Sequence, residues 1–241
     1  MNDFTQKFIS IFSANFLGRF ADEKTALCFQ ALTERMLEVN EHMNLTAITD
    51  TDGIILKHYA DSLTASEYIP DGASVIDIGC GAGFPSLPLA IARPDLHITA
   101  LDSTAKRINY ISETAQLLGL GNITAVSGRA EELAKNLSYR EKYDFACARA
   151  VARLNVLCEL CLPYVKVGGH FLAMKANADE ELAEAGNAIS LPGGKLERAE
   201  RIGLISSGGE ANPRTLILIK KISPTPKNYP RNNSQISKKP L

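Results

Sequence analysis

Residues 75–85 read VIDIGCGAGFP, and this stretch decides the fold class. An apolar run ends at Gly79, and two further glycines follow at Gly81 and Gly83. Glycines at a strand-to-helix turn allow positive φ angles and let a ligand approach backbone amides. A dinucleotide-binding turn would need its third glycine where this chain has Phe84, so the spacing argues against a dehydrogenase. A glycine turn with a purely structural role is the alternative.

Asp77 lies two residues before the first glycine of this turn. A carboxylate at that place would repel a pyrophosphate, whereas it would attract a cationic ligand. S-adenosylmethionine (SAM) is a cationic nucleoside cofactor, because its sulfonium and its amine both carry positive charge. We therefore expect SAM to bind at Asp77 and along the glycine loop, at Gly79, Gly81, Gly83 and Phe84.

Strand-like and helix-like segments alternate after residue 71. Strands are expected at 74–78, 97–102, 123–127, 143–148 and 170–175, and helices at 84–92, 104–118, 129–137, 153–164 and 179–189. This rhythm predicts parallel βαβ units in an open, doubly wound α/β sheet that is Rossmann-like. Residues 196–204 and 214–222 follow with no helix between them, so the seven-stranded sheet should end in an antiparallel hairpin.

The two ends of the chain differ from this central region. Residues 3–66 have apolar residues at helical spacing, with a possible cap at Asp22, which predicts an N-terminal helical subdomain over 1–70 and a SAM-binding domain over 71–222. Residues 223–241 are rich in Pro and Asn and are not expected to fold alone. The net charge of −1 divides into −7 over residues 1–219 and +6 over residues 220–241, so the C-terminal end is basic and suits RNA.

Polar residues end the expected strands, at the edge where a doubly wound sheet binds its ligand. Asp102 ends the second strand and is placed to accept the ribose hydroxyls, unless it only caps the next helix. Ala130 and Glu131 follow the third strand, where an adenine ring would lie. Arg149 and Lys175 end the fourth and fifth strands and suit a phosphate, a guanine edge or the cofactor's carboxylate. Solvated side chains or structural salt bridges are the alternative for both cations.

Further short motifs extend from the N-terminal helices to the tail. They are NLT at 44–46, KHYADSL at 57–63, DIGCGAGFPSLPL at 77–89, LDSTAKR at 101–107, GRAEE at 128–132, ARAVA at 148–152, LPYVKVGG at 162–169, TPKNYPR at 225–231 and KPL at 239–241. Together they resemble the RsmG (GidB) family of bacterial small-subunit rRNA guanine-N7 methyltransferases. The resemblance implies a class I SAM-dependent methyltransferase fold. It also implies SAM contacts at Gly79, Phe84, Ala130, Glu131 and Arg149, with Asp102 and Ser103 on the ribose side; Thr104 is added as their neighbour.

The resemblance implies methylation of N7 of a single guanine in 16S rRNA, at position 527. Guanine N7 has an in-plane lone pair and no proton, so alignment with the methyl group would suffice without a general base. No cysteine follows a proline, as transfer to a pyrimidine C5 usually requires. We expect Arg149, Lys175 and Arg129 to position the base and its phosphate as catalytic residues. Substrate binding is expected at His58, Lys106, Arg107, Arg214, Lys227 and Arg231.

The expected partner is 16S rRNA or the small ribosomal subunit. No apolar run approaches the roughly 20 residues that span a bilayer, so no membrane is expected. Five cysteines suggest reduced thiols in the cytoplasm, where we expect a monomer. Cys158 and Cys161 should pack in the core and hold no metal, while the roles of His58 and Asp61 stay open. The competing functions are a methyltransferase acting on a protein or small molecule, and a non-catalytic SAM- or RNA-binding factor.

Overall fold

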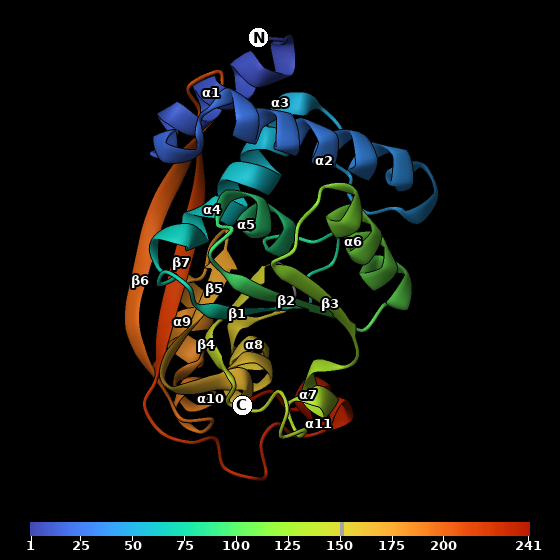
Figure 1. Cartoon of the computed structure of the whole chain (residues 1–241). Helices are drawn as coiled ribbons and strands as arrows, with labels where there is room; N and C mark the ends of the chain where they lie inside the picture. Colours follow the sequence, from blue (N-terminus) through green and yellow to red (C-terminus); the bar gives the residue numbers. More distant parts are fainter. Residues whose placement is uncertain (150–151) are drawn as a thin grey trace.

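A computed structural model describes residues 1–149 and 152–241. Ala150 and Val151, which belong to the ARAVA motif, lie outside the described residues. In the described part of the chain, seven strands form one sheet in the order β3-β2-β1-β4-β5-β7-β6 (Figure 1). The strands are β1 Ser74–Ile78, β2 His97–Asp102, β3 Ile123–Ser127, β4 Tyr143–Arg149, β5 Val165–Lys175, β6 Gly194–Ile205 and β7 Ala211–Lys221.

The strand directions agree with the sequence prediction. Strands β1 to β5 pair in parallel, whereas β7 pairs antiparallel with both β5 and β6. The α/β class and the antiparallel terminal hairpin are therefore confirmed. Strand order reverses between β1 and β4, and in open sheets of this kind ligands bind at that switch point.

Helices cover both faces of the sheet (Figure 1). They are α1 Asp3–Ala14, α2 Glu23–Met43, α3 Thr51–Gly53, α4 Asp61–Leu63, α5 Ser86–Ala92, α6 Ala105–Leu117, α7 Ala130–Leu133, α8 Leu154–Cys161, α9 Asp179–Glu184, α10 Gly186–Ser190 and α11 Asn233–Lys238. The cap predicted at Asp22 is present, since its side chain accepts a hydrogen bond from the Thr25 amide at 2.9 Å. No helix within the described ranges is long and apolar enough to cross a membrane.

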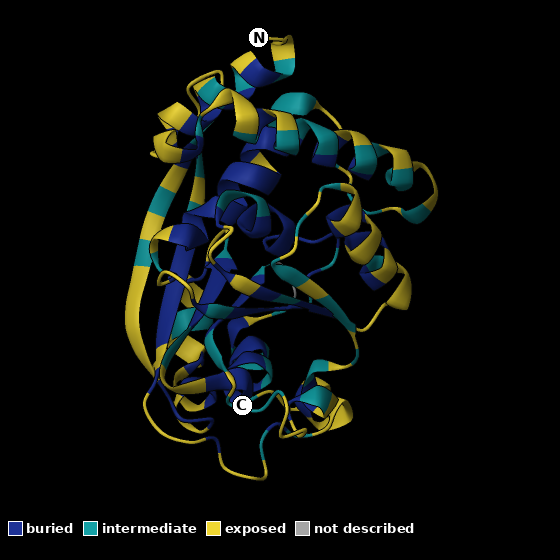
Figure 2. Cartoon of the chain, in the orientation of Figure 1, coloured by how far each residue is buried: buried dark blue, intermediate teal, exposed yellow. Residues whose placement is uncertain are grey.

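Two hydrophobic cores lie on opposite faces of the sheet because successive side chains of a strand point to opposite sides. Val75 of β1 packs into the core beneath the N-terminal helices, whereas Ile76 packs into the core around α8. Cys158 and Cys161 are fully buried in this second core, as predicted. Figure 2 shows the buried sheet between helices whose outer faces are exposed.

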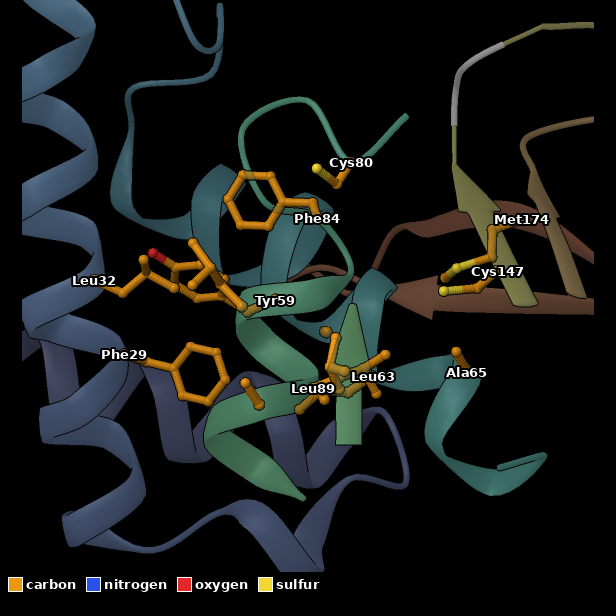
Figure 3. Packing of buried hydrophobic residues seen from close by; sticks show 14 of the residues in the cluster. Phe29, Leu32, Tyr59, Leu63, Ala65, Cys80, Phe84, Leu89, Cys147 and Met174 are labelled. Carbon is orange, nitrogen blue, oxygen red and sulfur yellow. The ribbon is translucent and has the colours of Figure 1, made fainter. Parts of the chain in front are cut away.

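The N-terminal helical layer packs directly behind the glycine loop. Phe29 of α2, Tyr59 and Phe84 form part of one buried cluster (Figure 3). Tyr59 lies in a π-helical segment, Ile54–Ala60, that continues α3 into α4. Such segments are rare and frequently occur at functional sites. This segment also carries His58.

The C-terminal residues 223–241, expected to be a tail unable to fold alone, pack against the rest of the chain. The Arg140 guanidinium donates hydrogen bonds to the carbonyls of Thr225, Pro226 and Tyr229 at 2.7–3.1 Å. Ile236 of α11 is buried. The basic tail is therefore folded onto the body along much of its length.

Candidate functional site

A cavity of about 510 Å³ opens at the carboxyl ends of the parallel strands. Residues at or directly after the ends of β1, β2 and β3, and Arg149 at the end of β4, contribute to its lining, in agreement with the switch-point rule. Its volume lies within the range of roughly 300–1,000 Å³ that is usual for small-molecule sites. The end of the parallel sheet therefore forms a ligand-sized site.

The glycine loop forms one wall of this cavity and owes its shape to three positive φ angles, 72° at Gly79, 56° at Gly81 and 86° at Gly83. The Gly79 amide donates to the Leu101 carbonyl at 2.8 Å, and the Gly81 amide donates to Asp102 Oδ2 at 3.1 Å. These two amides therefore hold the loop against β2. A Cβ atom at Gly81 would meet no atom closer than 3.9 Å, so glycine there leaves the cavity open for a ligand.

Two buried carboxylates face the cavity from neighbouring strand ends. Asp102 is held by the amides of Gly81 and Thr104, at 3.1 and 2.8 Å, and is 7% exposed. Glu131, on α7, is also 7% exposed, and Arg129 lies 3.4 Å from it. Two carboxylate acceptors, one at the end of β2 and one just after β3, suit a ribose and the amine of a purine.

The Phe84 ring connects the glycine loop to the cavity mouth. The His58 ring stacks on it with a centroid distance of 4.5 Å and an interplanar angle of 9°. The Arg149 guanidinium carbon lies 5.2 Å from the Phe84 centroid, within the range of a cation–π interaction. A loop residue, a helix residue and a strand residue therefore meet at one aromatic ring.

Asp61 of α4 joins two arginines at the cavity mouth. Its Oδ2 accepts a hydrogen bond from Arg149 at 3.0 Å, and its Oδ1 accepts one from Arg214 at 2.9 Å. Asp61 is only 5% exposed. Arg149 also donates to the Lys57 carbonyl at 2.8 Å. One buried carboxylate thus ties β4, β7 and the N-terminal helices together and leaves a net positive charge beside the cavity.

Burial controls the protonation of several groups around the cavity. Burial, with the nearby charge of Arg149, lowers the pKa of His58 to about 4, so its ring is neutral at pH 7. Burial also raises the pKa of the Cys80 thiol far above its usual value, so Cys80 stays protonated. Asp77 is fully buried, its pKa is raised to about 7 by desolvation, and its Oδ1 has no hydrogen-bond partner among the described residues.

Comparison with known proteins identifies the family. The family model described as rRNA small subunit methyltransferase G matches residues 27–203. A protein of Lactobacillus delbrueckii subsp. bulgaricus named ribosomal RNA small subunit methyltransferase G is 46% identical over 88% of this chain and 90% of its own length. A protein of the same name from Staphylococcus carnosus is 47% identical over 91% and 92%.

The chain belongs to the small-subunit rRNA methyltransferase G family. The resemblance derived from the motifs is thereby confirmed. Among solved structures, a SAM-dependent methyltransferase from Aquifex aeolicus superposes with a TM-score of 0.50 at 18% identity, covering 77% of this chain and 97% of that one. This likeness concerns the fold, which is that of class I SAM-dependent methyltransferases.

In this member of the methyltransferase G family, the cavity collects most of the residues expected at the site. The predicted residues that line it are Gly79, Gly81, Phe84, Asp102, Ser103, Thr104, Arg107, Arg129, Ala130, Glu131, Arg149 and His58. Their roles in binding or catalysis stay predictions, but their proximity is a property of the fold.

Other predicted residues of this methyltransferase G relative lie elsewhere. Asp77 and Gly83 lie outside the lining, although Asp77 Oδ2 supports the loop by accepting the Ser86 amide at 3.1 Å. Lys106 and Lys227 are exposed outside the cavity. Lys175 also lies outside the lining and pairs with Glu181 at 2.8 Å, so its expected catalytic role stays a prediction.

Two of the arginines expected to bind substrate hold structural contacts instead of lining the cavity. Arg214 reaches the mouth only through Asp61. Arg231 forms an ion pair with Glu159 that includes a 2.6 Å contact. Both guanidinium groups are therefore paired with carboxylates within the chain, and their expected role in substrate binding stays a prediction.

Several lining residues of this methyltransferase G fold were absent from the sequence prediction. They are Leu45, Ile78, Cys80, Ala82, Leu101, Gly128, Leu160 and Asn233. Most adjoin predicted residues in the chain, so their place follows from the strand ends. Leu45 lies in the NLT motif, which provided a signal. No pattern pointed to Leu160 or Asn233, nor to Asp61 as the partner of two arginines.

Proposed function

We propose that this protein transfers the methyl group of SAM to N7 of a single guanine of 16S rRNA. The observation that carries the proposal is that the family match at 27–203 contains every residue lining the described cavity except Asn233. The relatives that share this region are named ribosomal RNA small subunit methyltransferase G. The match therefore covers the site as well as the fold.

The cavity fits SAM by the chemistry of its walls. Asp102 would accept the ribose hydroxyls and Glu131 the purine amine, while the open space at Gly81 admits the chain of the cofactor. Arg149 would pair with the cofactor's carboxylate or with the substrate. Bound SAM supplies an electrophilic methyl group on a sulfonium.

The protonation states at the cavity favour positioning over proton transfer. Attack by guanine N7 releases no proton, so the reaction needs an oriented base and an aligned methyl group. Neutral His58 and the protonated Cys80 thiol supply neither a strong base nor a thiolate nucleophile at pH 7. Arg149, which lies over the Phe84 ring, and Arg129 both line the cavity and are suited to hold a base and its phosphate. Since the methylated guanine is cationic, these arginines would also favour product release.

Transfer of tritiated methyl groups tests the proposal directly. Purified protein is incubated with labelled SAM and either naked 16S rRNA or small subunits from cells that lack this enzyme, and the RNA is digested to nucleosides. We expect label in N7-methylguanosine and loss of transfer in Arg149→Ala. Label in another nucleoside, or transfer to a protein or small molecule only, would overturn the assignment, as would SAM binding without any transfer.

The same preparation tests the oligomeric state. We expect a cytoplasmic monomer whose substrate is 16S rRNA, free or within the small subunit. Light scattering of the purified chain should give the mass of one copy, 26.1 kDa. A concentration-independent dimer would contradict this expectation.

A further inference from the structure

The C-terminal segment reaches the cavity through Asn233 of α11, which belongs to the cavity lining. Leu160 of α8 also belongs to this lining, and both α7 and α11 pack against α8. Figure 1 shows α7 and α11 at the same end of the sheet. Asn233 therefore lies on the side of the cavity where Ala130 and Glu131 begin helix α7.

A buried ion pair holds this segment in place. Glu159 of α8 is fully buried, and the Arg231 guanidinium donates to both of its carboxylate oxygens at distances from 2.6 to 3.2 Å. The Arg231 amide adds a third donor group at 2.8 Å. A bidentate pair of this kind has a defined geometry, so it restricts the chain two residues before Asn233.

The Asn233 side chain is exposed, belongs to the cavity lining and retains hydrogen-bonding capacity. Its Oδ1 accepts only a long bond of 3.4 Å from Ser237, and its Nδ2 has no partner among the described residues. An asparagine amide offers one acceptor and one donor group side by side. The same pair of groups, in reverse, lies on the N6 and N7 edge of adenine.

Asn233 is also the single lining residue of the described cavity outside residues 27–203, where the family model matches. The C-terminal segment therefore contributes to the cavity lining. The basic tail that was expected to suit RNA therefore also supplies part of the wall of the cavity.

We propose that Asn233 is a specificity-determining contact for the adenine of SAM, with Oδ1 accepting from N6 and Nδ2 donating to N7. The proposal rests on the function proposed above. In this proposal Arg231 is a positioning residue, because its ion pair with Glu159 holds the segment that carries Asn233. Glu131 has only acceptor oxygens when ionised, so it cannot replace the donor that N7 requires.

Calorimetric binding of SAM and of its 7-deaza analogue, in which a CH group replaces N7, tests the contact. The wild type should bind the analogue about fivefold more weakly than SAM, since one hydrogen bond is lost. Asn233→Ala should bind SAM about tenfold more weakly than the wild type and should bind both ligands within a factor of two of each other. Ser234→Ala, an exposed neighbour on α11 outside the cavity, should behave as wild type.

Each alternative outcome has a separate meaning. Unchanged SAM affinity in Asn233→Ala overturns the inference alone. If the variant binds SAM and the 7-deaza analogue equally more weakly but keeps the wild-type preference for SAM, Asn233 has a merely structural role, and this outcome overturns the inference too. A wild-type protein that binds no SAM overturns the proposed function and the inference together. Thermal unfolding of Asn233→Ala at the wild-type temperature confirms that the variant is folded.

Discussion

Replacing Asp61 with asparagine removes a charge that two arginines share and preserves the shape of the side chain. In the wild type, Asp61 accepts hydrogen bonds from Arg149 at 3.0 Å and from Arg214 at 2.9 Å. The side chains of these arginines are 14% and 17% exposed. Asp61→Asn would therefore leave two poorly solvated cations facing each other without a counter-charge.

The cost follows from the burial of these groups. Removing one partner of a buried ion pair destabilises a protein by roughly 3–5 kcal/mol. Arg149 and Arg214 keep carbonyl acceptors at Lys57 and Pro213, so we expect the lower end, about 3 kcal/mol of unfolding free energy. Repulsion would also displace Arg149 over Phe84, and a displacement of about 1 Å can reduce a rate by about 100-fold.

Urea unfolding followed by circular dichroism measures the first effect, and kcat/KM for methyl transfer to rRNA measures the second. The matched control is Asp71→Asn, because Asp71 also pairs with an arginine, at 2.9 Å, but its side chain is fully exposed. The control should change neither quantity appreciably. The reasoning is refuted if Asp61→Asn unfolds within about 0.5 kcal/mol of the wild type and retains at least half of its kcat/KM.

Three further predictions concern other parts of the molecule. Arg231→Met should lower the unfolding free energy by about 3–5 kcal/mol in urea, because it strands the fully buried Glu159 charge; a change below about 1 kcal/mol would contradict this. The folded protein holds the pKa of His58 at about 4 while the unfolded chain returns it to about 6.5, so the unfolded state takes up the extra proton as pH falls between these values. The stability contributed by neutral His58, about 3 kcal/mol, is therefore lost as pH falls through that window. Between pH 7 and pH 4.5, the unfolding free energy measured in urea should decline less in His58→Gln than in the wild type. Gly193→Ala should destabilise by about 2–4 kcal/mol, because φ is 91° and the new Cβ would lie 2.2 Å from the Ser223 carbonyl oxygen; unchanged thermal unfolding would exclude that clash.

The sheet was largely predictable because its signals are local. Apolar runs bounded by turn residues located β1, β2 and β3 with the same bounds as the structure. The helix expected over 129–137 ends already at Leu133. There the Asn136 side chain accepts the Ser138 amide at 2.9 Å, a local bond that competes with helix formation. Strand β5 begins five residues earlier than expected, at Val165, and continues through Gly168 and Gly169. Glycine is required at 169, where a Cβ would lie 2.4 Å from the Asp144 carbonyl oxygen.

The site was predictable where it depends on strand ends and unpredictable where it depends on distant pairs. Asp102 and Glu131 follow strands, so topology alone brings them to one cavity. The partners of Arg149 and Arg231 lie 88 and 72 residues away in the chain, and single-sequence patterns carry no information on such pairings. For this reason Arg231 looked available for RNA although it is bound to Glu159.

The pairing of Glu159 with Arg231 has a consequence for how the protein is made. A nascent chain that stops before residue 231 contains a carboxylate deep in the core around α8 with nothing to neutralise it. Synthesis must pass residue 231, and this segment must leave the ribosome, before the buried Glu159 carboxylate has its Arg231 partner. Prematurely terminated products would therefore be unstable and open to proteolysis, which gives the cell a way to discard incomplete copies.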